Sequence, residues 1–224
     1  MSFGLVTEGI TDQEVISNIL YGYFNDPDLL INELQPLRDE TDKKKSSNFG
    51  GWGNLIEYCK SDVFKYAFQT TNYVVIQIDT DICEEYEISK KEAGKDLTPK
   101  ELIDKVTEMF VKHIGKDFYE KNKQRIIFAV AVHTIECWLL PLYYNNNKQS
   151  KTVGCLETLN QELSKKEGFT IDKNKKNLDY YREISKPFNK RKNLNLYYKK
   201  NPSFEVFINN LDVLQFENKL QDVQ

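Results

Sequence analysis

An apolar run rich in β-branched residues, YVVIQI at positions 73–78, constrains the fold of this chain more than any other segment. Apolar residues at consecutive positions indicate a strand that is buried on both faces, as in the centre of a parallel sheet. Further apolar runs at 3–7, 29–34 and 125–132 read as strands, and segments with helical spacing separate them. One helix is expected after the glycines at 50–53, with Val63 at helical spacing, and residues 84–100 read as a polar loop in which Pro99 opens the next helix. This alternation predicts an α/β fold with a mainly parallel sheet of about four strands flanked by helices.

The composition and length set the size of the core. The chain has 224 residues, 40% of them hydrophobic, with 13 Tyr and 13 Phe, which is enough apolar surface for a folded core. A polar segment, NNNKQSK at 145–151, reads as a linker. We therefore predict a catalytic domain over residues 1–145 and a helical, basic C-terminal extension over residues 146–224.

The sequence gives no sign of a membrane segment. Its longest uninterrupted apolar run, Ile126 to Val132, is far too short to span a bilayer. A strand pattern begins almost at Met1, which leaves no room for a signal peptide. We expect a cytoplasmic protein without membrane contacts.

The four cysteines and two histidines show no paired spacing of the kind that zinc sites use. We expect reduced, mostly buried thiols, because disulfide-stabilised domains carry a denser set of cysteines. Oxygen atoms are then the ligands that this chain offers to a metal, and oxygen ligands suit Mg²⁺, Mn²⁺ or Ca²⁺.

Acidic residues stand where two of the predicted strands end. Glu8 follows the first strand, and Asp79 and Asp81 follow the run at 73–78. The carboxyl ends of parallel strands form the edge where ligands bind, and carboxylates that converge there repel one another unless a cation lies between them. If the extended backbone continues to Asp81, its side chain and that of Asp79 point the same way, with Cα atoms about 6.5 Å apart. The pattern predicts a Mg²⁺ or Mn²⁺ site, with Glu136 after the last strand as a fourth candidate ligand.

Each of these acids also has a plainer interpretation. An acid at the end of a strand often caps a helix or lies solvated in a loop. Thr11 or Asp12, for example, can cap a helix that runs to about Phe24. The metal site depends on several acids meeting in space, which the sequence alone does not test.

Positive charge is concentrated in one block, residues 173–200. It holds ten Lys or Arg and two acids, a net charge of +8, whereas the whole chain has a net charge of −3. Five aromatic residues are interleaved with these cations, which favours a surface that binds a phosphate backbone and stacks bases. A solvated charged face is the alternative. From composition, the candidate nucleic-acid-binding residues are Lys186, Lys190, Arg191 and Lys192.

The order of the short motifs resembles that of the Toprim domain of topoisomerases, primases and overcoming-lysogenization-defect nucleases. The chain reads EG-x-TD at residues 8–12, a Gly-Gly turn at 50–51, D-x-D at 79–81 and IECWLL at 135–140. This order is closer still to that of small stand-alone Toprim-like proteins, some of which occur in bacterial anti-phage systems. The resemblance covers about residues 3–145.

The resemblance implies roles for particular residues. Glu8 would be a general acid/base or a metal ligand, Asp79 and Asp81 would be metal ligands, and Glu136 an additional ligand as in the nuclease branch. Nuclease relatives usually also supply a basic residue near the metals, and no position in this sequence matches it unambiguously.

These observations predict a Mg²⁺- or Mn²⁺-dependent nuclease that cleaves phosphodiester bonds in DNA or RNA. By resemblance, it would act in anti-phage defence, with a partner ATPase subunit, and an oligomer is compatible with the sequence. Two alternatives stay open at this point. One is a catalytically inactive Toprim-like module that binds nucleic acid or protein, and the other is nucleotidyl or phosphoryl transfer on a small nucleotide.

Overall fold

The computed structural model describes residues 1–26, 28–37 and 51–221, and side chains as far as residue 212. Gly50 of the predicted Gly-Gly turn lies outside the described residues. None of the described helices is both long enough and apolar enough to cross a membrane.

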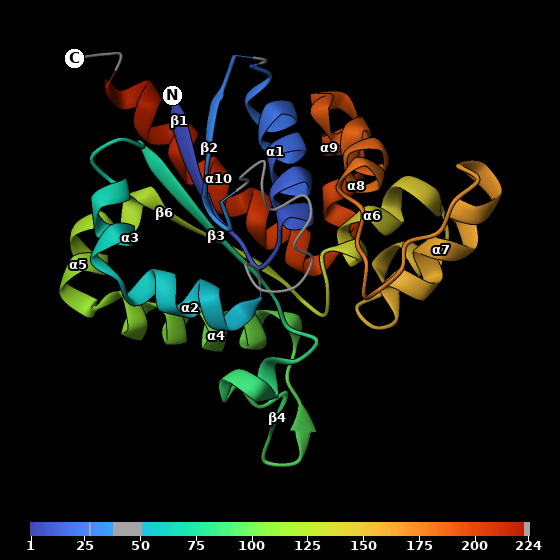
Figure 1. Cartoon of the computed structure of the whole chain (residues 1–224), viewed down its shortest axis with the longest axis horizontal. Coiled ribbons are helices and arrows are strands. Elements are labelled where there is room, and N and C mark those ends of the chain that lie inside the picture. Colours follow the sequence, from blue (N-terminus) through green and yellow to red (C-terminus); the bar gives the residue numbers. More distant parts are fainter. Residues whose placement is uncertain (27, 38–50, 222–224) are drawn as a thin grey trace.

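A four-stranded, wholly parallel sheet forms the centre of the fold (Figure 1), which confirms the predicted α/β class. Its strand order is β2-β1-β3-β6. The strands are β1 (Ser2–Val6), β2 (Leu30–Gln35), β3 (Tyr73–Asp79) and β6 (Ile126–Ala131). The segment between β3 and the next α-helix, expected to be a loop, contains the 3₁₀-helix η2 (Cys83–Tyr86) and a small antiparallel hairpin of β4 (Lys91–Glu92) and β5 (Lys95–Asp96).

Side chains of β3 alternate between two hydrophobic clusters, one on each face of the sheet. Val75 belongs to one cluster, and Val74 and Ile76 belong to the other. Ile127 and Phe128 of β6 divide in the same way. The sheet is therefore covered on both faces, which explains why these strands read as continuous apolar runs.

Helices from both ends of the chain cover the first face. They are α1 (Ile10–Phe24), α6 (Glu136–Tyr143), α7 (Cys155–Lys166), α8 (Leu178–Ser185), α9 (Arg191–Tyr197) and α10 (Pro202–Gln221). Short 3₁₀-helices link them: η4 (Asn147–Ser150), η5 (Lys186–Asn189) and η6 (Tyr198–Lys200). Trp138 of α6 is fully buried and stacks on Phe204 and Phe207 of α10. The C-terminal helical region thus shares one apolar cluster with β1, β3 and β6, while the predicted boundary at residue 145 stays a prediction.

The second face is covered by helices from the middle of the chain (Figure 1). They are α2 (Trp52–Lys60), α3 (Asp62–Ala67), α4 (Pro99–Ile114) and α5 (Lys116–Asn122), followed by the 3₁₀-helix η3 (Lys123–Arg125). The single helix expected after the glycines is two helices, because Ser61 caps α3 and interrupts the helical run. Thr98 and Glu101 form a capping box at the start of α4, where Pro99 opens the helix as predicted.

One glycine allows the C-terminal region to lie directly against α1. A Cβ atom added to Gly22 would stand 1.8 Å from the backbone oxygen of Phe188 in η5. The backbone of η5 therefore packs on the backbone of α1 at this point, and only a residue without a side chain fits.

Cys137 and Cys155 form a disulfide between α6 and α7, with Cα atoms 5.0 Å apart. The expectation of reduced thiols is wrong for this pair. Cys59 and Cys83 are free and buried, as expected. The 18-residue separation of the bonded cysteines carries no pairing signal, because it is the packing of α7 on α6 that brings them together.

Candidate functional site

Glu8 and Asp79 lie at the carboxyl ends of neighbouring strands, β1 and β3. From β1 the chain continues to β2 on one side of β1, and then crosses to β3 on the other side. Parallel α/β sheets bind ligands in the crevice at such a switch in strand order, which here lies between β1 and β3. The backbone N–H of Asp79 donates to Oε2 of Glu8 at 3.3 Å. The structure therefore brings together two of the acids that the sequence singled out.

The carboxylate of Asp79 is held in one orientation. It is 6% exposed, and its Oδ1 accepts hydrogen bonds from Nε2 of Gln77 at 2.9 Å and from the backbone N–H of Ile135 at 3.1 Å. Gln77 also accepts a hydrogen bond from the backbone N–H of Glu8 at 3.2 Å. Gln77, two residues before Asp79 on the same face of β3, thus connects the two strand ends.

Asp12, in the first turn of α1, is a third carboxylate of the site. The residue is 4% exposed, and its Oδ1 is buried with no hydrogen-bond partner among the described residues. The expectation that Thr11 or Asp12 caps α1 is wrong, because the helix begins at Ile10 and its N-cap residue is Gly9. Asp12 is thus not the N-cap residue; its carboxylate accepts a hydrogen bond from the backbone N–H of Gly9, and its charge raises the pKa values of Glu8 and Asp79.

Glu136 has partners of its own. This residue, at the start of α6, is 1% exposed, and its Oε1 lies 2.8 Å from Nζ of Lys176. The hydroxyl of Tyr181, on α8, donates to the same oxygen. Burial by itself would raise the pKa of Glu136, but Lys176 and these hydrogen bonds lower it to about 2. Glu136 is thus an ionised carboxylate whose charge is balanced.

The other carboxylates carry charge that is not balanced in this way. Burial, followed by repulsion from Asp12, raises the pKa of Glu8 to about 7. Burial raises the pKa of Asp12 to about 6, and burial with repulsion from Asp12 and Glu8 raises the pKa of Asp79. Charge attraction from Lys176 opposes each of these shifts. The site therefore divides into a neutralised side at Glu136 and a strained acidic side at Glu8, Asp12 and Asp79.

Asp81 lies in the turn that follows β3. The extended backbone ends at Asp79, so the premise that the strand continues to Asp81 is wrong. The backbone N–H groups of Thr80 and Asp81 both donate to the carbonyl oxygen of His133, at 2.8 and 3.0 Å, which bends the chain away from the sheet. The Asp81 carboxylate is still close enough to raise the pKa values of Glu8 and His133 by its charge, although burial and other groups outweigh it at His133.

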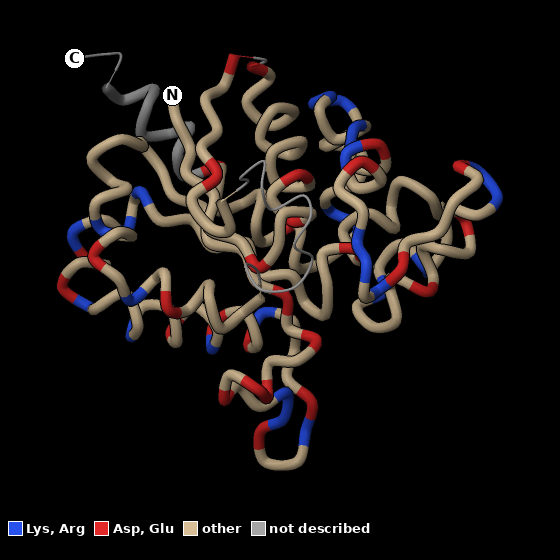
Figure 2. Tube along the Cα trace, in the orientation of Figure 1, with Lys and Arg blue, Asp and Glu red and all other residues tan. Residues whose placement is uncertain are grey.

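The basic residues chosen from composition stand apart from the strand ends. Lys186, Lys190 and Lys192 are exposed, whereas the Arg191 guanidinium donates to the carbonyl oxygen of Tyr23 and lies over the Tyr23 ring at 5.2 Å. Figure 2 shows the Lys and Arg of α9 at the top of the view, where β1 begins, while β1 and β3 end lower down. Their role in binding nucleic acid stays a prediction.

Lys176 is the cation that does reach the acidic residues. Burial by itself would lower its pKa, but attraction to Glu136, and also to Asp12 and Asp79, raises it, so the side chain is a fixed positive charge. Sequence reasoning passed over Lys176, which lies among Lys173, Lys175 and other polar residues. The one available signal was its place in the basic block, and this signal does not distinguish it from nine other cations.

The donor set fits a hard divalent cation, because it consists of carboxylate oxygens, one of them buried without a partner. The carboxylates are not gathered tightly. Within the described ranges, the one trio of metal-ligating side chains whose ligand atoms all lie within 4.8 Å of one another is His133, Cys137 and Cys155. An ion bound by Glu8, Asp79 and a third acid would therefore draw at least one carboxylate inward.

Comparisons with models of protein families, with curated proteins and with solved structures find no match for this chain. The resemblance to the Toprim domain therefore rests on the short motifs alone and stays a prediction.

Proposed function

We propose that this protein is a divalent-metal-dependent nuclease that hydrolyses phosphodiester bonds in DNA or RNA. The observation that carries the proposal is the meeting of Glu8, Asp12 and Asp79 in the crevice between β1 and β3, with Lys176 beside them. Buried carboxylates that repel one another cost stability, and a divalent cation removes that cost. A bound cation would offset the repulsion among these carboxylates, and this explains why they are placed together.

Glu8, Asp79 and Asp81 would hold the Mg²⁺ or Mn²⁺, and Asp12 adds a fourth oxygen donor at the same place. When bound, the ion would supply positive charge against the phosphoryl oxygens and would lower the pKa of water. Asp79 is oriented for this role by Gln77 and the N–H of Ile135. Glu136, proposed from the sequence as a further ligand, already balances Lys176.

Glu8 and Lys176 carry the charge of the site. In the metal-free chain the pKa of Glu8 is about 7, and a bound divalent cation would favour its ionised form, which is the form that binds metal. The Lys176 ammonium stays charged and adds fixed positive potential beside the acids, where a phosphodiester anion would otherwise be repelled. Glu136 and Tyr181 keep this ammonium in place.

The cellular setting belongs to the same proposal. We place the protein in the cytoplasm because its apolar runs are too short for a membrane segment. The motif resemblance adds a role in anti-phage defence and a partner ATPase. The exposed lysines of η5 and α9 provide a surface for nucleic acid.

One observation favours the alternative, a catalytically inactive module that binds nucleic acid or protein. In the described part of the chain no three carboxylates have their oxygens within 4.8 Å of one another. A site that never closes on an ion would keep the fold and the basic surface but not the reaction.

The experiment that separates the two uses the full chain with labelled single- and double-stranded DNA and RNA, in Mg²⁺, in Mn²⁺ and in chelator. Asp79→Asn and Glu8→Gln each remove one charge with almost no change in shape. Asp104→Asn, at an exposed position of α4, is the matched control.

We expect metal-dependent cleavage in the wild type and in Asp104→Asn, and its loss in Asp79→Asn and Glu8→Gln. Binding of Mn²⁺, followed by calorimetry, should weaken in the same two variants. Nucleic-acid binding without metal-dependent cleavage in the wild type would instead establish the inactive module.

A further inference from the structure

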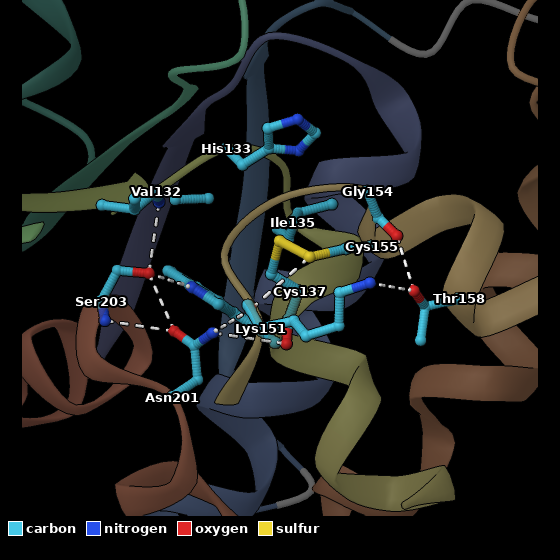
Figure 3. The surroundings of a disulfide bond; sticks show 12 residues. Val132, His133, Ile135, Cys137, Lys151, Gly154, Cys155, Thr158, Asn201 and Ser203 are labelled. Carbon is cyan, nitrogen blue, oxygen red and sulfur yellow. Dashed lines mark hydrogen bonds between the residues drawn. A yellow bond between two sulfur atoms is a disulfide. The ribbon is translucent and has the colours of Figure 1, made fainter. Parts of the chain in front are cut away.

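A second, chemically different cluster lies beside the acidic site. The ligand atoms of His133, Cys137 and Cys155 all lie within 4.8 Å of one another, and no other described trio does so. Figure 3 shows the His133 ring next to the disulfide, which joins the starts of α6 and α7. Both cysteines are fully buried, while His133 is partly exposed.

The imidazole of His133 has an unused nitrogen at this place. Its Nδ1 is buried and has no hydrogen-bond partner among the described residues. The backbone of His133 is fixed, because its N–H donates to Oγ1 of Thr80 at 2.8 Å and its carbonyl accepts from Thr80 and Asp81. A buried polar nitrogen without a partner costs free energy, and a bound ion is one way to recover it.

Both sulfur atoms lie in the first turn of a helix. Cys155 is the first residue of α7, and Cys137 is the second residue of α6. The N-terminal turn of a helix carries partial positive charge, which stabilises a thiolate relative to a thiol. Reduction of the disulfide would leave two buried thiols beside one imidazole, each within a helix turn that favours the thiolate a metal binds.

We propose that the reduced chain binds one Zn²⁺ ion through Nδ1 of His133 and the sulfur atoms of Cys137 and Cys155. Zinc bonds of about 2.0–2.3 Å in tetrahedral geometry place ligand atoms roughly 3.5–3.8 Å apart, so small side-chain movements bring these three atoms into range. The fourth position is filled by water on the exposed side of His133. Nitrogen and sulfur donors select zinc over Mg²⁺ and Mn²⁺, so this site is distinct from the acidic one.

A bound zinc ion and the disulfide exclude each other, because zinc binds the two sulfur atoms as separate thiolates and the disulfide bonds them to each other. Two small thiols such as glutathione reduce the Cys137–Cys155 bond and become one external disulfide, leaving two protein thiols. Binding of Zn²⁺ then releases two protons. In the opposite direction, one external disulfide accepts two electrons from the two thiolates, the protein disulfide forms, Zn²⁺ leaves, and the external thiolates take up two protons.

The test uses the full chain in two states, oxidised and phosphine-reduced, with excess Mg²⁺ present to occupy the acidic site. Each state is titrated with Co²⁺ as a spectroscopic probe and then with Zn²⁺. We expect the reduced chain to bind one ion and to show the absorption of a tetrahedral cobalt–thiolate site, which Zn²⁺ abolishes. We expect neither signal in the oxidised chain. This oxidised wild type is a control that requires no substitution.

Variants then assign the ligands. Cys155→Ser should lose the cobalt–thiolate absorption. His133→Asn should still form the disulfide but bind Co²⁺ and Zn²⁺ more weakly, and Asn suits the backbone here because residue 133 has φ 70°. Cys59→Ala, at a buried free cysteine of α2, is the matched control and should behave as the wild type.

Zinc should also protect the thiols. After exposure to glutathione disulfide, the zinc-loaded chain should keep all four thiols titratable on denaturation, and the metal-free chain only those of Cys59 and Cys83. Failure of the reduced wild type to bind Co²⁺, an unchanged spectrum in Cys155→Ser, or unchanged affinity in His133→Asn would each overturn the three-ligand site.

Discussion

The two helical layers of this protein differ in what they contribute to the candidate site. The layer of α1 and the C-terminal helices supplies Asp12, Glu136 and Tyr181, and the segment before α8 supplies Lys176. The layer of α2 to α5 packs an apolar face on the sheet and donates one backbone N–H, from Gly51 to the carbonyl of Glu8. One face of the sheet therefore supplies most of the ionisable side chains of the candidate site, and the other face contributes mainly apolar packing.

The same comparison holds within the site, between its two acidic parts. Glu136 is fully buried but balanced by Lys176, whereas Glu8, Asp12 and Asp79 share one cation at longer range. Burial raises the pKa of all four carboxylates. The pKa of Glu136 is nevertheless low, because Glu136 is in direct contact with Lys176. The C-terminal region thus determines which of these carboxylates has a direct cation partner and which do not.

Removal of that cation should give the largest effect. Lys176→Met leaves Glu136 buried without its partner, and we expect the free energy of unfolding to fall by about 3 kcal/mol. Lys175→Met, at the exposed neighbouring lysine, is the charge-matched control and should change it by less than about 0.5 kcal/mol. Urea unfolding measures both. Equal stability of the two variants would show that the ion pair does not hold the site together.

The docking of the C-terminal region on α1 gives the next effect. Gly22→Ala places a methyl group against the Phe188 backbone, and we expect a loss of about 2 kcal/mol. Gly53→Ala in α2 meets nothing within 4 Å and should gain about 0.5–1 kcal/mol through helix propensity. Thermal unfolding of the pair measures the difference. If Gly22→Ala is as stable as Gly53→Ala, the close approach of η5 to α1 does not occur in solution.

The pH dependence of stability should give the smallest effect for any single group. The folded-state pKa of Glu8 is about 7 and that of Asp12 about 6, both above their ordinary values of 4.5 and 3.8. Groups with raised pKa values add stability at low pH and lose it as the pH rises through the folded-state pKa. In chelator, we therefore expect the free energy of unfolding to fall from pH 5 to pH 8, by roughly 1–2 kcal/mol for each of the two groups.

Glu8→Gln should flatten this pH dependence, because Gln carries no charge at either pH. Glu108→Gln, at an exposed position of α4, serves as the control and should keep the wild-type slope. Urea unfolding at pH 5, 6, 7 and 8 measures the slopes. A wild-type slope in Glu8→Gln would show that the pH dependence comes from groups other than Glu8.

Much of the fold followed from local patterns in the sequence. The strands at 73–78 and 125–132 and the helix that begins at Pro99 were placed within a residue or two, because burial on both faces and capping residues leave clear local signals. The interruption between α2 and α3 was missed, since Val63 fits the helical spacing yet is 60% exposed. The periodicity of apolar residues gives their spacing but not their burial. From this spacing alone, α2 and α3 were predicted as one helix.

The sequence by itself determined that acids would stand at the ends of β1 and β3, because strand alternation and strand ends are short-range properties. Only the tertiary structure decided which groups meet them. Tyr181 reaches Glu136 across 45 residues, and Cys155 reaches Cys137 across 18, through the packing of C-terminal helices on α1 and α6. Contacts between distant segments depend on how whole helices dock, and no local pattern of residue types specifies that docking.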